Sequence, residues 1–277
     1  MSLRRICFSA LGSLGLSLEA ALAEPAQTGL AHNWQIGLQR AATPVMERLE
    51  AFHDKLLFII IATCVFVAVL LIYAMLRFNH RANPVPSKTQ HHTLLEVVWT
   101  LVPILILAYI AIYSFPLLYY EAAVPKPDVT IEVIGRQWYW TYVYTKEGGF
   151  QFDSNMLPDK LAKERGEPRL LGVDNPVYVP VGKNVEIITT GSDVIHSWAV
   201  PAFGVKMDAI PGRLNHTWFF AKDIGTYYGQ CSELCGANHA YMPIEVKVVS
   251  EKDYRAWLAQ AKRKYASSGP LRLASNE

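Results

Sequence analysis

Residues 56–76 read LLFIIIATCVFVAVLLIYAML, a run of 21 residues without a charged side chain. At a rise of about 1.5 Å per residue, a helix of this length spans about 30 Å, the thickness of the hydrocarbon core of a bilayer. Residues 97–120 form a second uncharged run that contains Pro103 and Pro116. Membrane helices tolerate proline when neighbours satisfy the freed carbonyls, so we expect a partner subunit to pack there. The alternative interpretation is two buried core helices.

The charge distribution separates these runs from the rest of the chain. Of the 277 residues, 51% are hydrophobic and 18% are charged. The two runs and residues 1–23 together contain only three charged residues, Arg4, Arg5 and Glu19. The remainder has a composition close to that of soluble domains, of which about 25% is charged. The uncharged segments exclude a simple soluble protein, and the near-normal composition of the remainder excludes a polytopic transporter. The net charge of +2 gives no indication of nucleic-acid binding.

The N-terminus has the features of a secretory signal peptide. Arg4 and Arg5 precede a short apolar stretch, which is followed by small residues typical of a cleavage site at 21–23. An uncleaved anchor is the alternative, and the shortness of the apolar stretch argues against it. A cleaved signal followed by two spans places the new N-terminus and everything after Tyr120 outside the cytoplasm. The basic loop between the spans also favours a cytoplasmic hairpin.

The soluble part consists mainly of short segments rich in Val, Ile, Thr and aromatic residues, which predict strands. Many short strands are typical of a β-sandwich or small barrel. Residues 145–175 are expected to form a long connection, and residues 250–264 an amphipathic surface helix. The expected strands are 129–134, 138–144, 177–181, 185–190, 216–221 and 244–249. The expected divisions are a signal peptide (1–23), an extracytoplasmic segment (24–55), transmembrane helices (56–76 and 97–120), a cytoplasmic loop (77–96), a soluble domain (125–250), and a C-terminal helix and tail (251–277).

A cluster of metal-ligand types lies in residues 227–243, which read YYGQCSELCGANHAYMP. Two thiols, an imidazole and a thioether fall within twelve residues, at Cys231, Cys235, His239 and Met242. Glycines and a proline in this stretch favour a loop over a continuous helix. Such a soft ligand set selects copper over calcium or magnesium, and the methionine argues against zinc.

Three other interpretations of the cluster stay open. A disulfide between Cys231 and Cys235 is possible in an oxidising compartment but leaves the histidine and methionine unexplained. A structural zinc site would not use methionine, and a mononuclear blue-copper site leaves one cysteine over. Two bridging thiolates could instead hold two copper ions if another histidine joined them. His196, directly after the apolar strand at 185–190, is the candidate, although a lone histidine beside Trp198 is more often structural.

Four segments resemble the cytochrome c oxidase subunit II family: CSELCGANH at 231–239, HSWAVP at 196–201, DAIPGR at 208–213 and GRQWYW at 135–140. The resemblance runs from the first span to about Val249. It implies a membrane-anchored all-β protein, in which a two-helix transmembrane hairpin is followed by a cupredoxin-like β-sandwich or barrel and a C-terminal amphipathic helix. The cupredoxin-like domain would carry the dinuclear CuA centre.

The resemblance also implies a ligand set for two copper ions. Cys231 and Cys235 match thiolates that bridge both ions. One ion would be completed by His196 and Met242, and the other by His239 and the backbone carbonyl of Glu233.

Further roles follow from the same resemblance. Trp138 matches the tryptophan through which electrons enter, although alone it reads as part of one aromatic strand face. The Glu233 side chain matches a ligand of Mg or Mn at the interface with subunit I. Asp174 and Asp193 match carboxylates that attract lysines of cytochrome c. Glu96 matches a carboxylate at the mouth of a proton channel, and is otherwise an interfacial residue.

The expected function is therefore transfer of electrons from cytochrome c, through the copper centre, to the haem-copper subunit I. That subunit would reduce O2 to water with proton pumping, so the oxygen-reducing site would not be in this chain. Subunit III and membrane lipid are further expected partners, with the copper domain in the periplasm and the helices in the inner membrane. The complete copper set argues against the related quinol oxidase subunit. The two-span hairpin and the chain length argue against a nitrous oxide or nitric oxide reductase.

Overall fold

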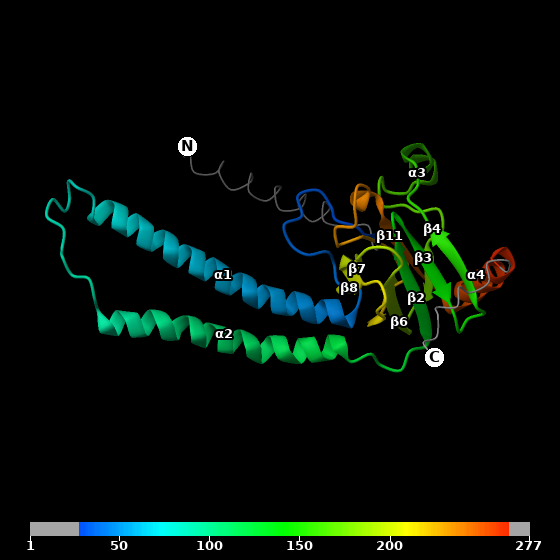
Figure 1. The fold of residues 1–277 in the computed structure, drawn as a ribbon, viewed down its shortest axis with the longest axis horizontal. Helices are drawn as coiled ribbons and strands as arrows, with labels where there is room; N and C mark the ends of the chain where they lie inside the picture. The colour runs from blue at the N-terminus through cyan, green and yellow to red at the C-terminus, as the bar shows by residue number, and fades with distance from the viewer. Residues whose placement is uncertain (1–27, 266–277) are drawn as a thin grey trace, which may run out of the picture.

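The computed structural model of the chain describes residues 28–265, in a long helical hairpin and a β-sandwich at one end of it (Figure 1). The expected signal peptide lies outside the described residues. The two hairpin helices are α1 (Pro44–Arg77) and α2 (Thr93–Ala122), and both are long and apolar enough to cross a membrane. Each contains one of the predicted spans and extends beyond it at both ends.

The start of α1 explains why this helix reaches outside the membrane. Thr43 accepts a hydrogen bond from the backbone N–H of Met46 at 3.1 Å, and Pro44 occupies the first helical position. Both features favour a helix start, since the cap satisfies a free N–H and proline lacks one. Val45 and Met46 are buried against the soluble domain. The first turns of α1 thus belong to the sandwich as much as to the hairpin.

The soluble domain contains three sheets (Figure 1). One has the strand order β1-β10-β11-β5, the second β4-β3-β2-β6-β9, and the third pairs β7 with β8. The strands are β1 (Thr28–Gly29), β2 (Val129–Arg136), β3 (Tyr139–Tyr144), β4 (Phe150–Ser154), β5 (Val177–Pro180), β6 (Asn184–Gly191), β7 (His196–Val200), β8 (Val205–Ala209), β9 (Asn215–Phe220), β10 (Gly225–Gln230) and β11 (Pro243–Val249). The remaining helices are α3 (Asp159–Arg165), α4 (Glu251–Lys264) and two short 3₁₀ segments, η1 (Pro201–Phe203) and η2 (His239–Tyr241). The predicted fold class, a membrane-anchored sandwich with a C-terminal helix, is confirmed.

Several elements differ from the sequence prediction. The expected long connection at 145–175 contains β4, which forms a tight hairpin with β3, and then α3. Gly149 has φ +67 in that hairpin turn, a left-handed conformation that glycine adopts without strain. His196, expected in a loop, is the first residue of β7. The sequence pattern does not predict strand β10, because glycines at 225 and 229 interrupt its apolar residues.

The core of the sandwich is rich in aromatic side chains. Trp140, Tyr142 and Tyr144 of β3 are at most 1% exposed, as the alternating sequence pattern leads one to expect for every second residue. Trp198 of β7 is also fully buried. Helix α4 covers another part of the core, where Trp257 stacks on a tyrosine of β5 at 4.8 Å between ring centroids. Buried rings of this size provide much of the apolar area that stabilises a domain.

Hydrogen bonds and an ion pair join the hairpin to the sandwich. Besides capping α1, the Thr43 hydroxyl donates to the carbonyl of Phe203 at 2.7 Å. Glu47 pairs with Lys222, which follows β9, at 2.6 Å. From α2, the Glu121 carbonyl accepts a hydrogen bond from the indole of Trp218 at 3.2 Å. Both membrane helices are therefore attached directly to the domain.

Candidate metal centre

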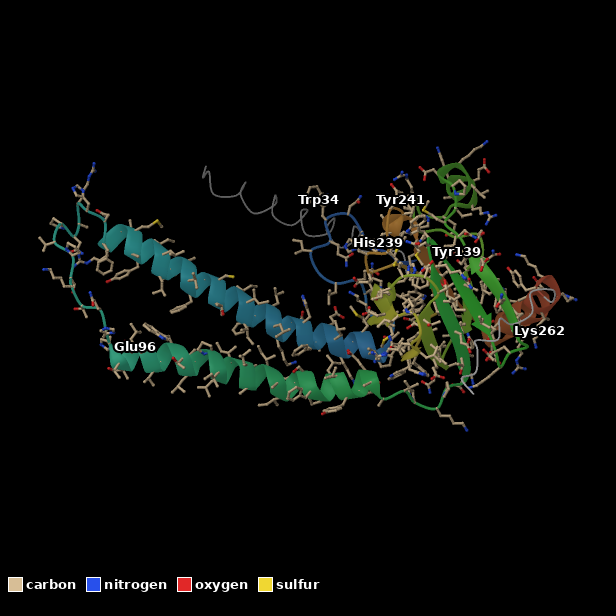
Figure 2. The ribbon with its side chains drawn as sticks, in the orientation of Figure 1. Trp34, Glu96, Tyr139, His239, Tyr241 and Lys262 are labelled. Atoms are coloured by element: carbon tan, nitrogen blue, oxygen red, sulfur yellow. The ribbon has the colours of Figure 1, made fainter. Side chains whose placement is uncertain are left out.

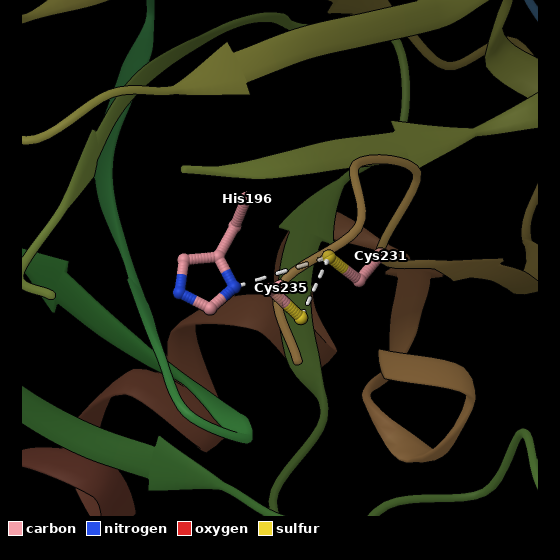
Figure 3. A group of neighbouring side chains, drawn as sticks. All are labelled: His196, Cys231 and Cys235. Carbon is pink, nitrogen blue, oxygen red and sulfur yellow. Dashed lines mark hydrogen bonds between the residues drawn. The ribbon is translucent and has the colours of Figure 1, made fainter. Parts of the chain in front are cut away.

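The two cysteines lie in the loop between β10 and β11, beside the first residue of β7 (Figure 3). The Sγ atoms of Cys231 and Cys235 are 3.8 Å apart. Nδ1 of His196 lies 3.9 Å from Sγ of Cys231, and Nδ1 of His239 lies 3.6 Å from Sγ of Cys235. Residues expected to act together are therefore brought together from two separate parts of the chain.

The backbone holds this loop at both sides. The N–H of Cys231 donates to the carbonyl of Met242 at 3.0 Å, which closes the loop at its base. The N–H of Ser232 donates to the carbonyl of Ser197 at 2.9 Å, which ties the loop to β7. The Met242 side chain is 1% exposed, so it lies in the core beneath the loop.

Two glycines make room for the close approach of strands at the site. A Cβ added to Gly229 of β10 would lie 1.8 Å from the carbonyl oxygen of Ala199 in β7. A Cβ added to Gly135 of β2 would lie 2.6 Å from the imidazole of His196. A side chain at Gly229 would force a strand to move, and one at Gly135 would force either the His196 imidazole or a strand to move, because real Cβ contacts are not this short.

The imidazole of His196 is oriented by Asp193. Its Nε2 lies 2.8 Å from Oδ1 of Asp193, while Nδ1 faces Cys231. A proton on Nε2, shared with the carboxylate, leaves the lone pair of Nδ1 free for a metal. Histidine ligands of metals commonly use a carboxylate in this way, which fixes the ring and its tautomer.

The pKa values of the two thiols are shifted in opposite directions. Burial raises thiol pKa values, but hydrogen bonds with His196 and nearby backbone groups outweigh burial at Cys231 and lower its pKa to about 6. Burial and the neighbouring Cys231 thiolate raise the pKa of Cys235 to about 12. Burial acts to lower the pKa of His196, but its hydrogen bonds with Cys231 and Asp193 outweigh that effect and raise the pKa. A metal that binds all three residues must therefore displace protons.

The donor set fits copper. Both cysteines are free, and their 3.8 Å separation is far longer than the roughly 2.05 Å of a disulfide bond. One ion at about 2.3 Å from a thiolate sulfur could contact both sulfurs at this separation. The backbone carbonyl oxygen of Glu233 lies 3.4 Å from Sγ of Cys231 and adds an oxygen donor. Soft sulfur with imidazole nitrogen is the set that copper prefers.

Trp138 contacts the backbone of the loop directly. Its indole N–H donates to the carbonyl of Cys235 at 3.2 Å, and the side-chain amide of Gln137 donates to the same oxygen at 2.8 Å. Strand β3 begins at Tyr139, so Trp138 lies in the turn before it and not within the strand as predicted. Gln137 was not predicted as a site residue, because nothing in the spacing of residues 137 and 235 indicates that they meet.

Of the four acidic residues expected to have a role, Asp193 and Glu233 lie at the cluster. Asp193 has a 32% exposed side chain and also accepts from the backbone N–H of Gln137 at 2.7 Å. Asp174 is exposed and accepts from the N–H of Asn155 at 2.7 Å. The Glu233 side chain is exposed on the loop between β10 and β11.

Glu96 lies in the first turn of α2, where it accepts from the N–H of His92 at 3.2 Å. Figure 2 places Glu96 at the loop end of the hairpin, at the opposite end of the molecule from His239. Glu96 is therefore not part of the metal cluster.

Comparisons with known proteins agree over nearly the whole described chain. The family described as "Cytochrome C oxidase subunit II, periplasmic domain" matches residues 129–249, and its transmembrane domain matches residues 31–117. The probable cytochrome c oxidase subunit 2 of Rickettsia bellii is 47% identical over 243 residues, which are 88% of this chain and 90% of the relative. Cytochrome c oxidase subunit 2 of Arabidopsis thaliana is 47% identical over 235 residues, 83% of this chain and 90% of the relative. The crystal structure of the periplasmic domain of subunit II of cytochrome oxidase of Bradyrhizobium japonicum is 56% identical with a TM-score of 0.49, and covers 52% of this chain and 99% of that one.

Proposed function

The chain belongs to the cytochrome c oxidase subunit II family, and we propose that it accepts electrons from cytochrome c at a dinuclear copper centre and passes them to the haem-copper subunit I. It is a membrane protein with two helices of transmembrane length and a periplasmic domain. The observation that carries the proposal is the pair of free thiols 3.8 Å apart, each with an imidazole nitrogen on its own side.

The distances between nitrogen and sulfur atoms suggest how the two histidines divide between two ions. His196 lies beside Cys231 and His239 beside Cys235, so the two histidines serve opposite ends of the sulfur pair. By the family resemblance, Cys231 and Cys235 would bind both ions, the buried Met242 would bind the same ion as His196, and the carbonyl of Glu233 would bind the same ion as His239. Copper ions bridged by two thiolates supply a one-electron redox centre that shares the charge between them.

The contribution of the protein is to keep this ligand set rigid. Asp193 fixes His196, and the bonds of Cys231 to Met242 and of Ser232 to Ser197 fix the cysteine loop. A site that does not rearrange has little reorganisation to undergo when an electron arrives or leaves. The buried surroundings also limit the access of water to the sulfurs.

Trp138 is the proposed point at which electrons enter. Its indole is half-buried, so one side faces the surface while its N–H contacts the carbonyl of the bridging Cys235. Asp174 and Asp193 would attract the lysines of cytochrome c to the domain, an effect that salt would weaken. The two aspartates are both exposed enough to take part.

The remaining roles concern subunit partners. The exposed Glu233 side chain would hold Mg or Mn at the interface with subunit I. Subunit I would reduce O2 to water with proton pumping. Glu96 would lie at the mouth of a proton channel into subunit I, at the cytoplasmic end of α2. Subunit III is a further proposed partner of the complex.

The proposal is tested by loading the full chain with copper and recording electron paramagnetic resonance with a copper count. Two copper ions per chain and the pattern of a delocalised mixed-valence pair are expected. A single copper ion with a mononuclear blue-copper spectrum would refute the dinuclear assignment. Reduction of the loaded chain by cytochrome c, followed in a stopped-flow spectrometer, then tests the donor.

A further inference from the structure

A groove runs between α1 and α2 at the end of the hairpin that is nearest the sandwich. Its upper part, the part closer to the sandwich, has a volume of about 220 Å³. It lies between Arg48 and Lys55 of α1 and Tyr113 of α2. Its lower part, about 550 Å³, is lined by Phe58 and Tyr109 among others. Ala51 and Lys55 line both parts, so the two parts are adjacent. α1 and α2 run side by side in opposite directions (Figure 1), so the lower part lies deeper in the membrane on both helices.

The two cations of the groove lie at the boundary of the membrane. The uncharged run of α1 begins at residue 56, directly after Lys55, and Arg48 lies two turns closer to the sandwich. This is the depth at which lipid headgroups meet the protein, and at which long basic side chains extend toward phosphate. Below it, Phe58, Ile59 and Tyr109 line the groove at the depth of the acyl chains, with Asp54 and Lys55 at its charged edge.

Neither cation is neutralised by a carboxylate. The guanidinium carbon of Arg48 lies 3.5 Å from the ring centroid of Tyr120, and the Lys55 ammonium lies 5.2 Å from that of Tyr113. Among residues 28–265, no carboxylate oxygen forms an ion pair with either side chain. The acidic neighbour Glu47 is instead paired with Lys222 at 2.6 Å. The aromatic rings lie against the two cations. One N–H of Lys55 donates to the carbonyl of Ala51 at 3.1 Å, and the remaining N–H groups of the two side chains are available to an anion.

One acidic residue also lines the groove. Asp54 is exposed at the edge of the lower part, and its nearest ionic partner is His53 at 3.6 Å. A purely anionic headgroup would place its charge near this carboxylate. A headgroup that carries a phosphate and a primary ammonium would complement all three charged side chains.

We propose that this groove binds a phospholipid with a phosphoethanolamine headgroup, whose phosphate lies between Arg48 and Lys55 and whose ammonium lies at Asp54. The acyl chains continue along Phe58 and Tyr109. The lipid thereby fills the space between the two helices just below their attachment to the sandwich.

Native mass spectrometry of the full chain in detergent tests the proposal, with phosphatidylethanolamine, phosphatidylglycerol, phosphatidylcholine or inorganic phosphate added in separate arms. One retained phosphatidylethanolamine per chain is expected, in preference to the other lipids. The double variant Arg48→Gln, Lys55→Gln should weaken its binding about tenfold or more, because charge-assisted hydrogen bonds to phosphate are lost. Lys126→Gln, which removes an exposed cation on the same side of the membrane but outside the groove, is the matched control and should bind as the wild type does.

Asp54→Asn separates the ammonium contact from the phosphate contact. This variant should keep lipid binding but lose the preference for ethanolamine over glycerol headgroups. Equal binding of all lipids by the wild type, equal retention by the double variant, or displacement of the lipid by millimolar inorganic phosphate would each overturn the proposal. Lipid analysis of the purified oxidase complex completes the test, and absence of the lipid there would overturn the proposal as well. An unchanged copper spectrum in every variant serves as the check of folding.

Discussion

The carboxylate of Asp193 lies 2.8 Å from Nε2 of His196, on the side of the imidazole opposite to the Cys231 thiol. The same carboxylate accepts a hydrogen bond from the backbone N–H of Gln137, the residue before Trp138. A single side chain therefore positions a proposed copper ligand and the turn that carries the proposed electron-accepting indole.

Replacing Asp193 by Ala should weaken copper binding by about 10- to 100-fold, as is usual when the carboxylate behind a histidine ligand is lost. The reason is that the imidazole loses the partner that fixes its tautomer and ring orientation. A competition titration with a copper chelator measures the effect. Asp193→Asn keeps an oxygen acceptor and should recover part of the affinity, whereas equal losses in both variants would point to the charge alone.

Replacing Cys235 by Ser should convert the site to one that holds a single copper ion, or abolish copper binding. Serine cannot supply the second soft bridging donor, and the neighbouring His239 would lose the sulfur that lies 3.6 Å from its Nδ1. Copper counting and electron paramagnetic resonance measure the outcome. A retained dinuclear signal would contradict the bridging role.

Replacing Trp138 by Gln should slow electron transfer from cytochrome c while the copper spectrum stays unchanged. The indole is held at the carbonyl of Cys235 but supplies no ligand atom to the cluster. Stopped-flow reduction and the copper spectrum are measured on the same sample. Tyr139→Phe, in the next residue of the chain, is the control, and parallel loss of rate and spectrum in the Trp138 variant would assign it a structural role instead.

Replacing Gly135 by Ala should lower copper affinity, because the added methyl group would meet the His196 ring at 2.6 Å. The imidazole or strand β2 must move, and displacement in a packed core costs typically about 1–3 kcal/mol. Thermal unfolding and copper titration report the two effects separately. Gly37→Ala is the matched control, since a Cβ there meets nothing within 4 Å; a similar loss in that variant would contradict the steric explanation.

Replacing Glu245 by Gln should stabilise the domain at neutral and alkaline pH. The Glu245 side chain is 1% exposed, and burial raises its pKa despite hydrogen bonding from the N–H of Val173 and the ion pair with Lys247. The folded state therefore binds the proton more tightly than the unfolded state does. The stability due to this group is present below the unfolded pKa and is lost as pH rises through the raised folded pKa.

The comparison for Glu245 is a series of thermal unfolding curves from acid to alkaline pH. The Glu245→Gln variant should gain over the wild type as pH rises, because it carries no charge to desolvate. Glu251→Gln, at an exposed position in the first turn of α4, is the control and should show no such divergence. If the unfolding temperature of the Glu245→Gln variant is lower than that of the wild type at every pH, the ion pair with Lys247 outweighs the cost of burial.

The sequence was most informative where a signal is local. The uncharged run at 56–76 and the spacing of Cys231 and Cys235 are short-range patterns, and the helix and the sulfur cluster follow from them. Gln137 and Cys235 are brought together by the packing of β2 and β3 against the β10–β11 loop, so no local pattern indicates their bond. The interruption of β10 by glycine has the same origin, since Gly229 is needed for the approach of β7 and not for the strand itself.

Thr43 caps α1 and bonds to Phe203 of the sandwich, so the first turn of the helix is fixed to the domain. The loop between β10 and β11 and the membrane hairpin should consequently move together as a rigid unit. A change in bilayer thickness that tilts α1 would tilt the loop by the same angle. The height of the metal site above the lipid surface is in this sense a property of the anchor, set by the length and tilt of α1.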